Sequence, residues 1–195
     1  MIKLPQCDTC QMRPETCSYF KDKCRDPKWG EDNCMIDHTV YLANSSGIKI
    51  GITRKYQQIH RWMDQGAVSA IPVFTVKKRL DAGLLEVQLK EKFADKTNWR
   101  KMLKGEIEEI DLNAEKEKLL KDFSSDVDFE VSEDSNYNFE FPVDQYPEKI
   151  VSLNFDKEKI VEGVLKGIKG QYLIFEHGVI NIRKFSSYQV RFSHS

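Results

Sequence analysis

Short runs of apolar and β-branched residues, separated by polar turns, define the centre of this chain. Residues 39–44 and 48–52 are two such runs, and they are separated by Ser45-Ser46-Gly47. Because glycine adopts the backbone angles of tight turns at little cost, the two runs are predicted to form an antiparallel hairpin. A third strand is predicted over residues 71–76.

Helical periodicity follows the hairpin in three places. A helix is predicted over about residues 54–65, after Thr53, whose hydroxyl group can cap it, because apolar residues recur there at helical spacing. Leucine and phenylalanine recurring every fourth residue predict a second helix near 82–94, and Trp99 and Leu103 predict a short third one. The predicted order is therefore β-β-α-β-α-α, which is an α+β arrangement.

The two ends of the chain have other patterns. Residues 1–38 alternate cysteine, proline, glycine and charged residues without helical or strand periodicity, which is typical of a coil stapled by metal. From residue 150 onward, short strand-like runs predict a small β-barrel-like module or a curled sheet. These runs cover residues 151–155, 171–175, 179–183 and 188–192.

An acidic segment separates the predicted core from the β-rich end. It contains a predicted helix over 112–123, followed by a polar stretch over 124–138 that reads as a mobile insert. The expected parts of the chain are a cysteine-rich metal-binding segment (1–38), an α+β core (39–104), an acidic linker or insert (105–149) and a small β-rich module (150–195).

The net charge of −1 hides an uneven distribution of charge along the chain. Residues 49–104 hold thirteen lysines and arginines against five aspartates and glutamates, whereas residues 105–149 hold four against fifteen. A basic block of this size suits a polyanionic partner, and the acidic block beside it could mask that surface or recruit a basic protein. A patchy solvated surface without a partner is the alternative interpretation.

Length and hydropathy set the broad class of the protein. With 195 residues and 40% hydrophobic content, the chain can bury a core. No apolar run approaches the roughly 18 residues that span a bilayer, and the first residues lack the apolar stretch of a signal peptide. We therefore expect a cytoplasmic protein without a membrane partner.

All five cysteines fall within the first 34 residues, an odd number that favours metal ligation over disulfides in a chain without an export signal. Cys7-Asp-Thr-Cys10 has the spacing of a knuckle that grips a structural zinc ion. An iron–sulfur cluster, or reduced cysteines without a metal, are the alternatives. The remaining ligand candidates, among which the sequence does not choose, are Cys17, Cys24, Cys34 and His38.

The hairpin and the helix after it resemble the GIY-YIG nuclease superfamily. Thr39-Val40-Tyr41 stands at the first strand motif, Lys49-Ile50-Gly51 at the second, Arg61 on the following helix and Glu86 on a later one. The resemblance covers about a third of the chain. It implies a three-stranded antiparallel sheet with flanking helices over residues 39–104.

The resemblance also implies a divalent-metal-dependent endonuclease, with a role such as DNA repair. Glu86 would hold Mg²⁺ or Mn²⁺, Tyr41 would take a proton from the attacking water, and Arg61 would bind the phosphate. Lys49 stands where the signature has its second tyrosine. Its ammonium group cannot act as a phenol, but it can contact a phosphate.

At greater length, the chain resembles an uncharacterised bacterial family catalogued as a domain of unknown function. The stretches that carry this resemblance are Cys34–His38, Val40–Gly47, Arg61–Ala67, Lys96–Arg100 and Gly167–Leu173.

Three classes of function are therefore considered. The first is an endonuclease acting on nucleic acid, DNA in preference to RNA, with Lys49, Arg54 and Lys55 contacting the phosphates. The second is a nucleic-acid-binding protein without catalysis. The third is a scaffold that recruits a protein through the acidic block or the C-terminal module, where basic and aromatic residues interleave.

Overall fold

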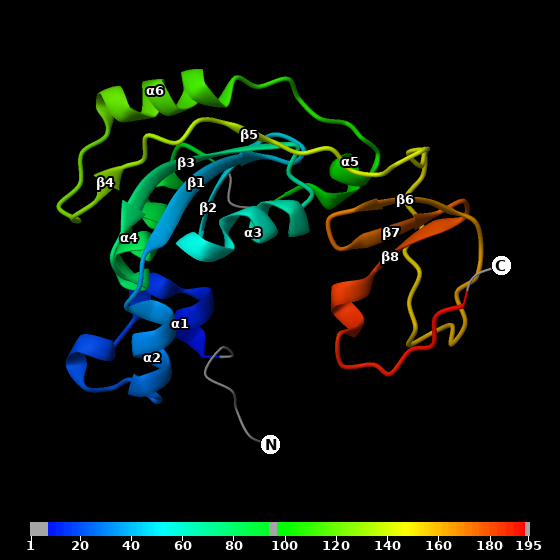
Figure 1. Ribbon diagram of the computed structural model, residues 1–195, viewed down its shortest axis with the longest axis horizontal. Coiled ribbons are helices and arrows are strands. Elements are labelled where there is room, and N and C mark those ends of the chain that lie inside the picture. Colours follow the sequence, from blue (N-terminus) through cyan, green and yellow to red (C-terminus); the bar gives the residue numbers. More distant parts are fainter. Residues whose placement is uncertain (1–7, 94–96, 194–195) are drawn as a thin grey trace.

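The computed structural model describes residues 8–93 and 97–193. Its centre is an antiparallel sheet in the order β2-β1-β3-β4, in which β5 also pairs with β3 (Figure 1). The strands are β1 (His38–Asn44), β2 (Ile48–Arg54), β3 (Ser69–Val76), β4 (Glu130–Val131) and β5 (Tyr137–Asn138). The three strands expected from the hydrophobic pattern are confirmed.

The β1–β2 hairpin forms for the reason the sequence suggests. Gly47 lies in the turn with φ of +152°, a conformation that other residues rarely adopt. Its backbone N–H donates to the side-chain oxygen of Asn44 at 3.1 Å, which closes the turn. The register then pairs Tyr41 with Gly51.

The first helix of the core is shorter than predicted. Instead of one helix over 54–65, a 3-10 turn, η4 (Lys55–Gln57), leads into α3 (Gln58–Asp64). Thr53 does not cap this helix, because it remains in β2 and pairs with Thr39 across the hairpin.

The later helices are close to their expected positions. The helix predicted near 82–94 is α4 (Arg79–Leu89), which starts and ends earlier; residue 94 of the prediction lies outside the described residues. The two remaining helices are α5 (Trp99–Leu103) and α6 (Leu112–Asp122). The Asn98 and Asp111 side chains accept backbone N–H groups at their first turns, so the local cap chemistry fixes both starts.

Alternate residues of β1 point to opposite faces of the sheet, and each face is covered by different helices. Val40 and Leu42 pack with leucines of α4 and α6. Tyr41 and Ala43 pack instead with Trp62 of α3. The sheet therefore forms the middle of three layers, with α3 alone among these helices on the Tyr41 face (Figure 1).

The acidic segment is joined to this sheet. Its strands β4 and β5 extend the sheet beside β3, and Tyr137 and Phe139 pack against Trp62. The buried Lys116 of α6 donates to the backbone oxygen of Ser132 at 2.6 Å, which ties the helix to the returning chain. The stretch that reads as an insert in the sequence is thus part of the core packing.

The N-terminal segment is helical where a coil was expected. It contains α1 (Thr9–Met12), the 3-10 turns η2 (Pro14–Thr16) and η3 (Tyr19–Lys21), and α2 (Pro27–Cys34). Asp26 caps α2 by accepting the N–H of Trp29 at 3.0 Å, and proline suits the first helical position. These helices are too short to show a periodic apolar pattern, which is why the expectation of a coil was wrong.

The C-terminal module is an open three-stranded sheet in the order β6-β7-β8, and no closed barrel forms among the described residues. Its elements are β6 (Leu165–Lys169), β7 (Tyr172–Phe175), β8 (Gly178–Asn181) and the 3-10 turn η5 (Ile182–Phe185). Two predicted strands are wrong. Residues 151–155 contribute only a single bridge, from Ser152 to Val179, and residues 188–192 are exposed and carry no strand.

The module packs against the core through α5. Met102 and Leu103 share a buried cluster with Ile174 and Val179, and the rings of Trp99 and Tyr172 stack 5.9 Å apart. Arg183 also reaches Asp64 at the end of α3, at 2.9 Å. In the described part of the chain, no helix combines the length and apolar character needed to cross a bilayer.

Candidate functional site

The Tyr41 side chain lies over Gly51 of the neighbouring strand. The two residues are register partners, and a Cβ atom on Gly51 would lie 2.6 Å from Tyr41 Oη. A non-bonded contact of that length is far inside van der Waals distance, so only glycine leaves room for the phenol. The glycine of the second strand motif therefore allows the tyrosine of the first to occupy this position.

The Tyr41 hydroxyl group and the Lys49 ammonium group share one acceptor. Tyr41 Oη donates to Oε1 of Gln65 at 3.3 Å, and Lys49 Nζ donates to the same oxygen. Both donors are almost completely buried, with exposed fractions of 1% and 5%. Gln65 immediately follows α3 and lies four residues beyond Arg61, one helical turn further along the chain.

Arg61 and Glu86 both act electrostatically on the Tyr41 phenol. Burial raises the pKa of Tyr41 above its ordinary value, and the Glu86 charge raises it further, whereas Arg61 and the Gln65 hydrogen bond lower it. Arg61 of α3 and Glu86 of α4 are thus close enough for their charges to act on Tyr41 of β1. Tyr41 is a protonated hydrogen-bond donor at neutral pH.

Glu86 approaches from the other side of the sheet. It belongs to α4, which covers the face opposite Tyr41, and its carboxylate lies 3.5 Å from Lys90 Nζ. The Glu86 side chain keeps 15% of its surface exposed. It also attracts the buried guanidinium group of Arg79, whose pKa is lowered mainly by burial and raised by the Glu86 and Cys34 charges.

The other predicted nucleic-acid contacts lie apart from this group. Arg54 ends β2, about 16 Å along the strand from Lys49. It donates to the backbone oxygen of Asn33 at 2.9 Å and sits 5.7 Å from the Trp29 ring centroid, so the N-terminal segment engages it. Lys55 lines an open hollow beside Asp32 and Asp37.

In the C-terminal module, one basic residue of the interleaved pattern is buried. Lys169 is 1% exposed and donates to Tyr146 Oη at 3.2 Å. Its ammonium group also lies over the rings of Tyr146 and Phe141, and burial lowers the pKa of Lys169 to about 8. This lysine ties the module to the acidic segment, in which Tyr146 and Phe141 lie, and its charge is buried.

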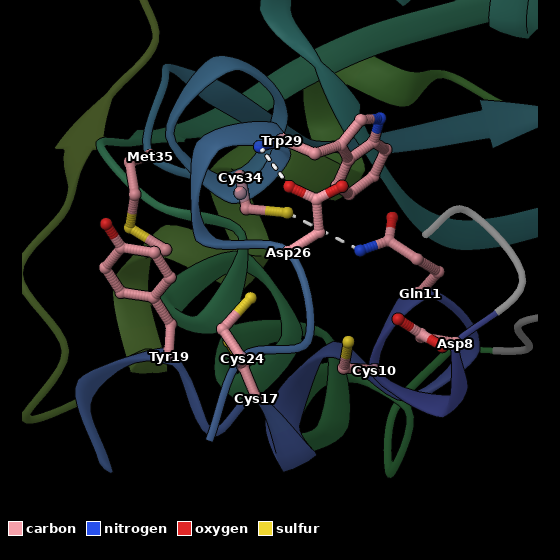
Figure 2. Close-up of a pocket in the computed structure, with 11 residues that line it drawn as sticks. Asp8, Cys10, Gln11, Cys17, Tyr19, Cys24, Asp26, Trp29, Cys34 and Met35 are labelled. Carbon is pink, nitrogen blue, oxygen red and sulfur yellow. Dashed lines mark hydrogen bonds between the residues drawn. The ribbon is translucent and has the colours of Figure 1, made fainter. Parts of the chain in front are cut away.

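Four of the five cysteines surround one small cavity in the N-terminal segment (Figure 2). Its volume is about 20 Å³, room for one particle the size of a water molecule or an ion. All four are free thiols, and they are Cys10, Cys17, Cys24 and Cys34. The prediction for Cys7 lies outside the described residues.

The cavity wall carries polar groups close to the sulfurs. Gln11 Nε2 donates to Cys34 Sγ at 3.5 Å. Burial raises the pKa of Cys34, whereas Gln11, Arg79 and Arg54 lower it. Burial also raises the pKa of Cys10, and the neighbouring Cys17 and Cys24 raise it further. Within residues 8–93 and 97–193, no three histidine, cysteine, aspartate or glutamate side chains already converge as ligands of one ion.

His38, the remaining predicted ligand, does not line this cavity. It is completely buried at the start of β1, where Nδ1 lies 2.7 Å from the backbone oxygen of Ile36, and Nε2 has no hydrogen-bond partner among the described residues. Burial lowers the pKa of His38 to about 4, helped by the charges of Arg79 and Arg54. The imidazole is therefore neutral, with its proton on Nδ1.

Sequence reasoning did not identify Gln65 or Arg79. Gln65 had a detectable signal, because a residue four positions after Arg61 falls on the same side of a helix. Arg79 had none, since it is one of three consecutive basic residues and its importance depends on contacts with residues far away in sequence.

Comparisons with known proteins identify a family for the chain. No curated protein and no solved structure matches it. One family profile, described as "Protein of unknown function (DUF2797)", matches residues 1–190. Because that match covers almost the whole length, the chain belongs to the DUF2797 family.

Proposed function

We propose that the protein binds nucleic acid, DNA in preference to RNA, around Arg61, and hydrolyses a phosphodiester bond there with one Mg²⁺ or Mn²⁺ ion held by Glu86. The observation that carries this proposal is the hydrogen bond from Tyr41 to Gln65, one helical turn beyond Arg61, together with the charges of Arg61 and, to a smaller extent, Glu86 that act on the phenol. The three groups combine a phosphate ligand, a proton carrier and a metal ligand, which phosphodiester hydrolysis needs.

Arg61 provides the phosphate contact. It is exposed on α3, and a guanidinium group can donate two parallel hydrogen bonds to phosphate oxygens. Lys49 and Tyr41 are buried donors that share Gln65, which lies one helical turn beyond Arg61. If Gln65 moved aside, both donors could turn toward a bound phosphate, so Gln65 would act as the placeholder for that anion.

Glu86 provides the metal ligand. A single carboxylate can hold Mg²⁺ or Mn²⁺ when water fills the remaining positions, and the partial exposure of Glu86 leaves access for a hydrated ion. When bound, the ion would activate a water molecule. That water would attack phosphorus as the bond to the leaving sugar oxygen breaks. Tyr41, after releasing its own proton to solvent, would accept the water proton as a phenolate, and the leaving oxygen would take a proton from solvent.

Binding without cleavage is the second candidate. Tyr41 is 1% exposed and its hydroxyl hydrogen is engaged by Gln65, so it meets no water in this conformation. Lys49 also replaces a phenol with an ammonium group, and α4 reaches the site from the opposite face of the sheet. These features are the observations that support a protein that binds phosphate without transferring a proton. A protein partner for the acidic block or the C-terminal module remains a prediction.

A cleavage assay on plasmid and branched DNA, with Mg²⁺ or Mn²⁺, separates the two candidates. We expect weak cleavage that Glu86→Ala abolishes and the matched control Glu91→Ala, in an exposed position, retains. Gel-shift affinity should survive Glu86→Ala, because phosphate contacts come from the basic residues. A cleavage rate unchanged by Glu86→Ala excludes this site, and binding without cleavage under any divalent ion selects the second candidate.

A further inference from the structure

We infer that Cys10, Cys17, Cys24 and Cys34 are the ligands of one tetrahedral zinc ion, and that this ion fixes the N-terminal segment against α4 and the end of β2. The inference concerns a site separate from the proposed phosphodiester site and stands without it. It also selects one ligand set from the several that the sequence permits, because it leaves out Cys7 and His38.

The four thiols come from four different places in the segment and meet around one space. Cys10 lies in α1, Cys17 follows η2, Cys24 precedes α2 and Cys34 ends α2. All four line the cavity of about 20 Å³ (Figure 2). Zinc prefers four thiolate or imidazole ligands in a tetrahedron, which matches the number of sulfurs here.

The size of the cavity favours a single ion. A cluster of several irons and bridging sulfides occupies far more space than one water-sized particle. One zinc ion fits after the thiols lose their protons and close on it, since metal binding and folding of such sites are coupled. None of these four cysteines forms a disulfide, so all four sulfurs are available to bind the ion.

The surroundings suit a negatively charged metal centre. One Zn²⁺ ion with four thiolates has a net charge of about −2, and the charges of Arg79 and Arg54 both act on Cys34. The Gln11 amide donates to the Cys34 sulfur, as outer hydrogen bonds do around ligating thiolates.

The short helical elements that carry or separate these cysteines are the parts that touch the core. Arg79 at the start of α4 donates to the backbone oxygen of Gln11 at 2.7 Å. A Cβ atom on Gly83 of α4 would lie 2.6 Å from the Glu15 backbone nitrogen, so η2 and α4 pack backbone against backbone. At the end of β2, Arg54 donates to the backbone oxygen of Asn33 in α2. Fixing the cysteines therefore fixes the contacts on α4 and β2.

The test uses the full chain, loaded with zinc alone. Elemental analysis should give one zinc per chain. Alkylation of the wild-type protein, read by mass spectrometry, should show Cys10, Cys17, Cys24 and Cys34 protected by zinc, and Cys7 modified at the same rate with or without it. This measurement needs no variant, so a failure of folding cannot obscure it.

Variants provide the second readout. Cys34→Ser and Cys17→Ser should each weaken zinc binding by more than about tenfold, whereas Cys7→Ser and His38→Gln should keep one zinc. Protection of Cys7 in place of Cys34, loss of zinc in Cys7→Ser, the absorption of an iron–sulfur cluster, or a folded, reduced protein without affinity for zinc would each overturn the assignment. None of these outcomes depends on nuclease activity.

Discussion

Tyr41 and Gly51 face each other across the β1–β2 ladder so closely that a methyl group on Gly51 would lie 2.6 Å from Tyr41 Oη. The glycine is therefore required by the tyrosine and not by its own backbone angles. This explains in physical terms why glycine, a residue with low strand propensity, stands in the middle of the edge strand β2.

Gly51→Ala should destabilise the protein by about 1–3 kcal/mol, because the added methyl group overpacks the site. Replacing Tyr41 by leucine in the same chain should remove most of that cost. Urea unfolding of both single variants and the double variant gives the coupling energy. Independent, additive effects of the two substitutions would show that the close approach is not the cause.

Gln65→Ala should also destabilise the fold, by about 1–3 kcal/mol, because it removes the acceptor of buried hydrogen bonds. Its acceptor serves both Tyr41 and Lys49. Adding Lys49→Met should recover part of the loss, since that change removes one of the donors. A double variant no more stable than Gln65→Ala would contradict the shared-acceptor arrangement.

Nucleic-acid affinity should fall steeply with salt, as expected when phosphate contacts release counterions. Arg61→Ala should weaken binding and reduce the slope of log affinity against log salt by about 1, whereas Arg191→Ala, in the exposed C-terminal stretch, should leave the slope unchanged. Gel shifts at several salt concentrations measure both quantities. Equal slopes for wild type and Arg61→Ala would remove Arg61 from the interface.

Stability should fall as the solution is acidified, in part because of His38. Its pKa is 6.5 in the unfolded chain and about 4 in the folded protein, so the folded state favours the neutral ring. The neutral His38 ring therefore contributes up to about 3 kcal/mol to the free energy of unfolding. This contribution is fully present above pH 6.5 and is lost as the pH falls toward 4.

Urea unfolding between pH 4 and pH 7 tests this effect. His38→Gln should flatten the dependence, and His60→Gln, at an exposed position on α3, should reproduce the wild-type curve. Parallel curves for wild type and His38→Gln would show that other groups carry the acid sensitivity.

Zinc should raise the melting temperature of the reduced protein. An ion that binds only the folded chain stabilises it by about 2.7 kcal/mol at a free concentration of one hundred times its Kd. The effect should vanish in Cys10→Ser and persist in Cys7→Ser, as measured by thermal unfolding with and without chelator. A melting temperature that changes neither with added zinc nor with chelator would contradict a stabilising role for the ion.

The sequence by itself determined the local elements of the core. The hairpin, β3, α5 and α6 were predictable because turn glycines, apolar runs and cap residues act within a few positions of one another. It also placed all the candidate metal ligands in one segment. Where a signal was weak or short, as in α2 or the predicted strand at 188–192, the expectation failed.

The tertiary structure decided which of these residues meet. Gln65 joins Tyr41 to Lys49, the charges of Glu86 and Cys34 both act on Arg79, and β4 and β5 extend the core sheet, all through residues distant along the chain. Periodicity identifies the face a residue occupies, but not the partner packed against that face. For the same reason, the spacing of the cysteines could not choose a ligand set, and the set inferred above rests on their common cavity.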